Sequence, residues 1–450
     1  MTHTTRDLTT GPVWRALARL SAPMMIGIMA TLSVGLADAY FLAQLGGAPL
    51  AAVGFIYPVT ATVTSLSIGL SAGANATVSQ AIGAKAQDRN PTRIGLHAVG
   101  LGLVLALIVS GLIFVTYPTL FALLGAQDDA AAEIALFMPW WCAAFPFLVV
   151  QMQVSALFRA HGSSVVPAVL LTVGAIVNIA LDPLLIFTAG LGTEGAALAT
   201  FIARASFAVL GVGYAVRTGV LVWCPNVTRD LWWSIKELFK VGGPAAFSNA
   251  INPAGMAAVT AAVATVGTEA VAGFGAATRV QQLALVPMLA LSAGIGPIVG
   301  QNWGGGDTSR AAQALQAALA FCVCYGVAIG VALFMFASTL SDWLASAGPA
   351  ADYAAIYLRI VGWSLFGYGF VVVINAAMNA RSRAVWSMVL SLGRIGLFYI
   401  PLAWLGVSLM DFKGITLAAA AANVAAATVG VFFAARLGLF RATNLRMTFA

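Results

Sequence analysis

Two aspartates inside long apolar segments are the residues of this chain best suited to carry chemistry. Of the fifteen acidic residues, Asp38 and Asp182 alone lie away from the ends of apolar runs. A carboxylate deep in a membrane helix costs about 2.5–3.5 kcal/mol, and such acids usually mark ion or substrate pathways. Because a carboxyl group removed from water binds a proton more readily, the pair predicts proton uptake and release. The alternatives are a sodium ion held by the oxygens, or hydrogen bonds between helices without a role in transport.

Two further oxygen-bearing side chains are expected beside this pair. Asn178 precedes Asp182 by four residues, so the two share one face of a helix. Thr200 lies in the next apolar run, at a comparable expected depth. We predict that Asp38, Asn178, Asp182 and Thr200 form an oxygen cluster that binds a proton or Na⁺.

Other polar and sulfur-containing side chains in the apolar runs are suited either to line a substrate cavity or to pack between helices. The candidates for substrate lining are Met29, Asn75, Gln153, Gln281 and Asn375.

Four arginines also lie in the interior of apolar runs. Arg279 and Arg359 are near expected helix ends, where a long side chain reaches the headgroups. Arg204 and Arg394 are deeper. Arg204 pairs either with an aspartate of the cluster or with groups nearer the inner side, and we expect the pairing nearer the inner side. The role of Arg394 stays open.

The composition is that of a membrane protein. Hydrophobic residues make up 61% of the chain and charged residues 8%, whereas soluble domains carry about 25% charged residues. Crossing a bilayer core of ~30 Å takes about 20 residues of helix. We therefore expect twelve transmembrane helices, at roughly 15–43, 50–80, 93–117, 135–158, 165–188, 193–216, 242–266, 272–300, 311–338, 354–378, 385–408 and 414–437.

The distribution of basic residues predicts the orientation in the membrane. Apart from Lys413 and the four arginines inside runs, every Lys and Arg lies at the N-terminus, in alternate loops or at the C-terminus. Positively charged loops stay in the cytoplasm, so we expect both termini there. The net charge of +7 then reflects topology, and no nucleic-acid partner is expected.

Residues 23–83 recur in the second half of the chain at a shift of 221 positions. The second half lacks counterparts of Asp38 and Asp182. Asp38 falls on Val259, and the counterpart of Asp182-Pro183, near Ile400-Pro401, keeps the proline alone. The matched pairs include Pro23/Pro244, Gly46/Gly267, Gly54/Gly275, Gln80/Gln301 and Gly83/Gly304. Such a repeat predicts an all-α polytopic membrane protein with two pseudo-symmetric six-helix lobes around a central cleft.

The expected domains follow from the runs and the basic segment between the halves. They are a cytoplasmic leader at 1–14, an N-lobe at 15–216, a cytoplasmic linker at 217–241, a C-lobe at 242–437 and a cytoplasmic tail at 438–450.

Several motifs together resemble the multidrug and toxic compound extrusion (MATE) family over about residues 12–437. The motifs are Ala22-Pro23, the segment LADAYFL at 36–42, QAIGA at 80–84, FRAHG at 158–162 followed by Asn178-x-x-x-Asp182-Pro183, and PIVGQNWGGG at 297–306. The resemblance implies a twelve-helix antiporter of a bacterial inner membrane. It implies export of organic, often cationic or amphipathic compounds in exchange for H⁺ or Na⁺ by a functional monomer without a cofactor.

Within that family the chain is most similar to the DinF-like branch, in which the coupling aspartate lies on the first helix. Its partners on the fifth and sixth helices carry over to Asn178, Asp182 and Thr200, the aspartate to Asp38, and the bend-forming proline hinge to Pro23. The NorM-like branch uses acids of the second lobe, and the corresponding stretches 245–255 and 370–379 contain none.

The sequence leaves two alternatives to a transporter of this family. A flippase for a lipid-linked precursor needs a cationic cavity for a diphosphate, for which Arg204 and Arg394 are few. A membrane enzyme acting on diphosphates needs clustered acids, and Asp128-Asp129 in a loop is the nearest candidate. We therefore expect a transporter and not an enzyme.

Overall fold

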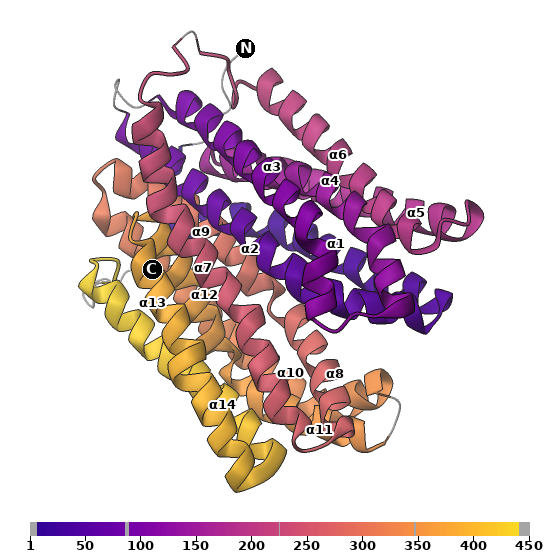
Figure 1. The fold of residues 1–450 in the computed structure, drawn as a ribbon. Helices are drawn as coiled ribbons and strands as arrows, with labels where there is room; N and C mark the ends of the chain where they lie inside the picture. Colours follow the sequence, from indigo (N-terminus) through magenta and orange to yellow (C-terminus); the bar gives the residue numbers. More distant parts are fainter. Residues whose placement is uncertain (1–6, 86–89, 225, 346–347, 441–450) are drawn as a thin grey trace. The chain divides into compact units, whose positions relative to one another are not determined.

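The computed structural model describes residues 7–85, 90–224, 226–345 and 348–440, and Figure 1 shows its course. Across these ranges the chain is helical and contains no strand. Parts of all five expected segments lie outside the described residues: 1–6 of the leader, 86–89 of the N-lobe, Pro225 of the linker, 346–347 of the C-lobe and 441–450 of the tail.

The first six apolar runs each form one helical pass. Short connections separate them, and several contain glycine with positive φ, such as Gly46 at 125° and Gly190 at 68°. The elements are α1 (Val13–Leu45), α2 (Gly47–Ala84), α3 (Pro91–Leu123), α4 (Asp128–Ala160), α5 (Val165–Pro183) with the π-helical turn η1 (Leu184–Thr188), and α6 (Gly192–Arg217).

The second half contains more broken helices. Helices α8 and α9 meet at a bend of 44°, and α14 is interrupted at Met410 and Asp411, where Asp411 has φ of 50°. The elements are α7 (Leu231–Ala264), α8 (Thr268–Ala284), α9 (Val286–Gly304), α10 (Thr308–Ala345), α11 (Pro349–Val361), η2 (Gly362–Ser364), α12 (Leu365–Ala380), α13 (Ala384–Leu392), η3 (Gly393–Tyr399) and α14 (Ile400–Arg436).

The twelve expected passes are present in the described ranges. Nine helical segments are long and apolar enough to cross a membrane, and the bent α8–α9 pair adds a tenth. The segment Ala384–Arg436 counts once among the nine, yet its break at Met410 divides it into two passes. Helix α7 completes the set. Its hydropathy is lowered by Lys236, Glu237 and Lys240 in its first part and by Asn249 and Asn252 further on. The prediction of an all-α polytopic fold with twelve helices is therefore confirmed.

The chain forms two compact units. The first contains Pro23–Ala246, and the second contains Leu8–Ala22 together with the described chain from Phe247 onward. The first unit therefore takes α1 from Pro23, and the second unit takes α7 from Phe247. Pro23 is the repeat partner of Pro244, so both divisions fall at corresponding places in the two halves.

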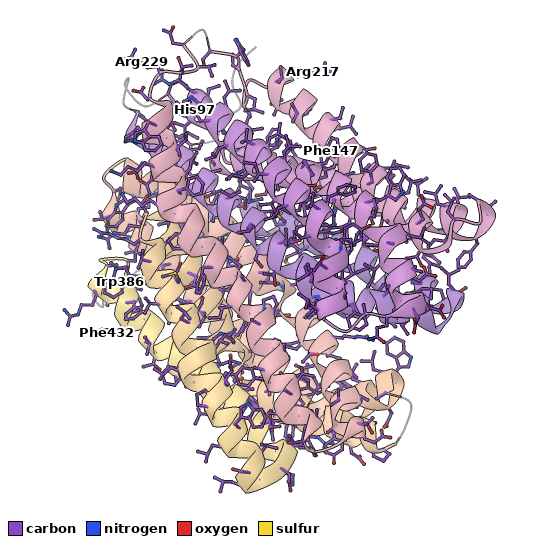
Figure 2. All side chains as sticks on the ribbon, in the orientation of Figure 1. His97, Phe147, Arg217, Arg229, Trp386 and Phe432 are labelled. Carbon is purple, nitrogen blue, oxygen red and sulfur yellow. The ribbon has the colours of Figure 1, made fainter. Side chains whose placement is uncertain are left out.

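Within the first unit, the segment after α6 is attached to the start of α3. Arg93 forms an ion pair with Asp230 at 2.5 Å. The buried ring of His97 contacts Ser234 Oγ at 2.8 Å and the carbonyl oxygen of Val227 at 2.5 Å. Figure 2 shows His97 at the same end of this unit as Arg217 and Arg229. Basic side chains therefore collect at that end.

Candidate ion and substrate site

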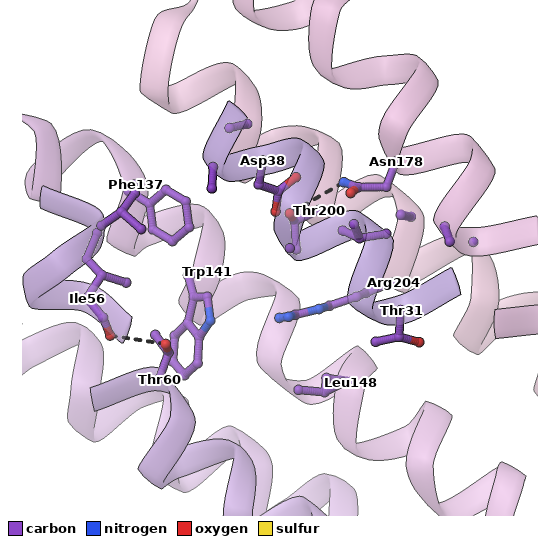
Figure 3. A pocket seen from close by; sticks show the side chains of 18 of the residues that line it. Thr31, Asp38, Ile56, Thr60, Phe137, Trp141, Leu148, Asn178, Thr200 and Arg204 are labelled. Carbon is purple, nitrogen blue, oxygen red and sulfur yellow. Dashed lines mark hydrogen bonds between the residues drawn. The ribbon is translucent and has the colours of Figure 1, made fainter. Parts of the chain in front are cut away.

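A cavity of about 400 Å³ lies among α1, α2, α4, α5 and α6. All the residues that line it belong to the first unit. Figure 3 shows polar side chains on one part of its wall and aromatic side chains on another. The polar ones include Asp38, Asn178, Thr200 and Arg204. A cavity of this kind, mainly apolar with a few converging polar groups, is typical of a small-molecule site.

Helical spacing brings the polar side chains to this wall. Asn178 and Asp182 are one turn apart on α5, and Thr200 and Arg204 are one turn apart on α6. Asn178 Nδ2 donates a hydrogen bond to Thr200 Oγ1 at 3.5 Å, which joins the two helices. Pro183 ends the regular part of α5, and the π-helical turn η1 follows.

The carboxyl groups of Asp38 and Asp182 lie within side-chain hydrogen-bonding reach of each other. Asp38 lines the cavity, whereas Asp182 is fully buried behind the wall. The structure thus brings Asp38, Asn178, Asp182 and Thr200, the four residues of the expected oxygen cluster, into one region.

This cluster contains more acceptors than donors. Asp38 Oδ1, both carboxyl oxygens of Asp182 and Asn178 Oδ1 are buried and receive no hydrogen bond from any described donor. A buried acceptor left unpaired costs about 1–3 kcal/mol, more when it is charged. Facing carboxylates also repel each other unless a proton or cation lies between them. The arrangement is therefore suited to bind H⁺ or a small cation such as Na⁺.

Arg204 lies in the cavity wall together with Asp38. It is close enough to act on Asp38 electrostatically, yet among the described residues it makes no direct ion pair with an acid. Its Nη1 atom is buried and has no hydrogen-bond partner there. The structure thus places Arg204 near the aspartates, and not in the pairing nearer the inner side that the sequence favoured.

The five residues expected to line a substrate cavity do not lie on the wall of this one. Met29 is 52% exposed, and Gln153 packs against Gly102 of α3. The others make hydrogen bonds: Asn75 Nδ2 donates to the carbonyl oxygen of Ala156 at 3.3 Å, Gln281 Oε1 accepts from Tyr357 at 2.7 Å, and Asn375 Nδ2 donates to Ser391 Oγ at 2.9 Å. Their role in substrate binding stays a prediction.

Sequence reasoning missed the aromatic part of the cavity. Phe137, Trp141, Leu148 and Gln151 line it from α4, and Tyr57 and Phe207 add rings from α2 and α6. The α4 residues recur at intervals of four, seven and three, which is one face of a helix. The sequence alone therefore contained a signal for this face of α4, and the same spacing predicts that Gln151, not Gln153, lines the cavity.

The second unit has no matching acid cluster in its described part. Val259 stands at the position that corresponds to Asp38 and is fully buried. The buried cation there is Arg394, whose Nη2 donates to Asn252 Oδ1 at 2.6 Å and Nη1 to Asn423 Oδ1 at 3.3 Å. Its guanidinium also lies over the ring of Tyr368, 4.9 Å from the centroid. Neutral amides and an aromatic ring thus satisfy this arginine.

Comparison with known proteins identifies this architecture. A protein-family model described as MatE matches the chain twice, at residues 23–184 and 244–405. Over 436 residues the chain is 32% identical to a protein of Shewanella oneidensis named FAD transporter, covering 96% of both chains. It is 26% identical to the probable multidrug resistance protein YoeA of Bacillus subtilis, covering 87% of this chain and 86% of YoeA. It is 24% identical to the multidrug export protein MepA of Staphylococcus aureus, covering 90% of this chain and 89% of MepA.

Solved structures agree with these relatives. A crystal structure of a mutant of the Vibrio cholerae MATE transporter VcmN superposes with a TM-score of 0.91 at 26% identity, over 97% of this chain and 98% of that one. VcmN in its bent form gives a TM-score of 0.90 at 26% identity, over 99% of both chains. The chain therefore belongs to the MatE family of membrane transporters.

Proposed function

We propose that this protein is a cation-coupled exporter of small organic compounds, and that Asp38, Asn178, Asp182 and Thr200 bind the coupling H⁺ or Na⁺. The observation that carries the proposal is the pair of facing, buried carboxyl groups whose oxygens receive no hydrogen bond from a described donor. A proton or sodium ion between them removes both the repulsion and the missing hydrogen bonds.

The proposed transport cycle alternates between two conformations. A cation that enters from outside neutralises the aspartate pair, α1 changes its bend near Pro23, and the cargo leaves outward. Coupling requires that cation and cargo favour different conformations, because a ligand shifts an equilibrium only by its differential affinity. Pro23 supports the hinge role, since proline removes a backbone hydrogen bond within a helix and the compact units divide at this residue.

We also propose the topology and organisation expected from the sequence. The termini and the basic end near His97, Arg217 and Arg229 face the cytoplasm of a bacterial inner membrane, by the positive-inside rule. The six-helix lobes span 15–216 and 242–437, joined by the linker 217–241, and one chain acts as a functional monomer of the DinF-like branch.

Two cargo classes fit the family. The first class is amphipathic, often cationic compounds. The similarity to multidrug proteins and the acidic cluster both support it. The Shewanella relative, at 32% identity over 96% of both chains, favours a flavin dinucleotide, and its identity exceeds that of the multidrug relatives. A lipid-linked diphosphate, the cargo of the alternative flippase, is less favoured because none of these three relatives is named for such a cargo.

The test uses everted membrane vesicles in which a pH gradient and a sodium gradient are imposed separately. Transport of ethidium and of FAD is followed by fluorescence. A gradient of one ion should drive accumulation of a cargo in the vesicles, and the ion that does so is the coupling ion. Transport that responds to neither gradient would overturn the proposal of cation coupling.

A further inference from the structure

We propose that Arg204 makes this cavity a binding site for an anionic aromatic compound. Its guanidinium binds a phosphate or carboxylate of the cargo, and the aromatic side chains of the wall contact the ring. The inference rests on the proposed export function and names the substrate class of the same site.

The first support is the environment of the guanidinium. Arg204 lines the cavity, and in Figure 3 its side chain extends across the pocket toward Trp141. Its buried Nη1 has no hydrogen-bond partner among the described residues. A guanidinium presents five N–H donors in a planar arrangement that matches phosphate and carboxylate oxygens. An anion in the cavity would supply the missing acceptor.

The second support is the charge balance of the wall. Asp38 is the one acid that lines the described cavity, and its carboxyl group is engaged with Asp182. When a proton or sodium ion neutralises that pair, Arg204 is left as the uncompensated charge of the site. An isolated buried charge is costly unless it is paired, so the ion-loaded site favours an anion.

Arg394 of the second unit provides an internal comparison. It is buried in a membrane helix as well, yet its guanidinium already donates to Asn252 and Asn423 and lies over Tyr368. Arg394 therefore has its acceptors within the protein. Arg204 lacks one at Nη1, which distinguishes a group prepared for a ligand from one that stabilises the fold.

The third support is the aromatic lining. Tyr57, Phe137, Trp141 and Phe207 surround the cavity from three helices. Aromatic pairs stabilise a complex beyond the apolar area that they bury. A ring against these residues with an anionic group on Arg204 satisfies both parts of the wall, whereas a purely cationic cargo leaves Arg204 unpaired.

This cargo class has a consequence for coupling. Within one conformation, an anion near Arg204 and a cation at Asp38 favour each other's binding, so direct charge competition does not produce antiport. Exchange then comes from different affinities of the two conformations. Outward movement of an anion is also favoured by an inside-negative membrane potential.

The experiment measures binding of riboflavin, FMN and FAD to the purified full-length protein by quenching of flavin fluorescence. The three probes share one ring system, and riboflavin lacks phosphate. We expect FMN and FAD to bind about tenfold more tightly than riboflavin, the size expected for a charge-assisted hydrogen bond. In Arg204→Gln the ratio should fall to about one, and Arg204→Lys should retain an intermediate ratio because it keeps a point charge.

The matched control is Arg217→Gln, which removes an equal charge from the exposed end of the same helix and should leave the ratio unchanged. Equal binding of FMN and riboflavin by the unaltered protein would overturn the inference. A tenfold preference for FMN that persists in Arg204→Gln would also overturn it. If Arg204→Gln does not fold, Arg204→Lys decides: a preference equal to that of the unaltered protein would overturn the inference. The ratio is measured without any ion gradient, so its failure is distinguishable from failure of cation-driven transport.

Discussion

Asp38 on α1 and Asp182 on α5 direct their carboxyl groups at each other from helices that are far apart in the sequence. Asp182 is fully buried, and the described residues provide no donor to either of its oxygens. The buried Asp182 is therefore not accessible to water, whereas Asp38 faces the cavity. The two residues should therefore act as a single ion-binding unit.

The first prediction concerns Asp38→Asn. The change removes the charge that faces the cavity while keeping the size of the side chain, so gradient-driven efflux should fall by about 10- to 100-fold, the usual range of a coupling free energy. Efflux in everted vesicles measures this, with size-exclusion elution as the check on folding. Asp129→Asn, an exposed acid at the start of α4, should transport normally. Full coupled efflux by Asp38→Asn would contradict the proposed role.

The second prediction is that the two aspartates do not act additively. Residues of one network show interaction free energies of about 0.5–3 kcal/mol. Asp182→Asn should therefore reduce gradient-driven efflux about as strongly as Asp38→Asn. The efflux rate of the double variant should be at most about threefold below that of the less active single variant. A complete double-mutant cycle of gradient-driven efflux rates checks this. If the two losses multiply, the residues act independently and the idea of a shared ion is wrong.

Much of this fold is predictable because the bilayer fixes the length of each helix. Twelve passes follow from apolar runs of about 20 residues, and the spacing of four between Asn178 and Asp182 places them on one face. The repeat likewise indicates which half lacks acids, and Val259 indeed stands buried where Asp38 would be. Local periodicity and composition are sufficient for these conclusions.

The rest depends on packing between helices, which a single sequence does not encode locally. Arg204 faces Asp38 because α1 and α6 both border the cavity, and nothing in either segment alone determines that. The π-helical turns η1 and η3 were not among the elements expected from the sequence. Residues 8–22 group with the second unit, although residues 15–22 begin the expected N-lobe.

The third prediction concerns Thr200→Val, which removes the hydroxyl that accepts from Asn178 and keeps the shape of the side chain. One hydrogen bond contributes about 1 kcal/mol, so the apparent affinity for the coupling ion should fall about fivefold. The measurement is the dependence of efflux on the concentration of that ion. Thr172→Val on α5 is the control, because the Thr172 hydroxyl donates to Ala168 of its own helix. An unchanged ion dependence in Thr200→Val would remove Thr200 from the site.

The fourth prediction tests the orientation. Cys224 and Cys324 are first replaced by alanine. A single cysteine then replaces either Arg383, which is exposed just before α13, or Lys413, which is exposed just after the break in α14. An impermeant maleimide should label the variant Lys413→Cys in intact cells, and Arg383→Cys only after permeabilisation, because basic loops stay inside. The opposite labelling pattern would reverse the topology.

The last prediction concerns the packing that positions the end of α5. Gly195 of α6 lies against the backbone of η1, and a Cβ added there would come within 2.7 Å of the carbonyl carbon and oxygen of Leu185. Because backbone atoms cannot rotate away, Gly195→Ala should lower the free energy of unfolding by about 1–3 kcal/mol.

Gly213 on the same helix is the matched control, since a Cβ there has nothing within 4 Å. Alanine has a higher helix propensity than glycine by about 1 kcal/mol, so Gly213→Ala should be as stable as the unaltered protein or more so. Thermal unfolding in detergent, followed by intrinsic fluorescence, compares the two variants. Equal melting temperatures would show that η1 moves to accommodate the methyl group. In that case the contact between α6 and η1 does not fix the position of Asp182.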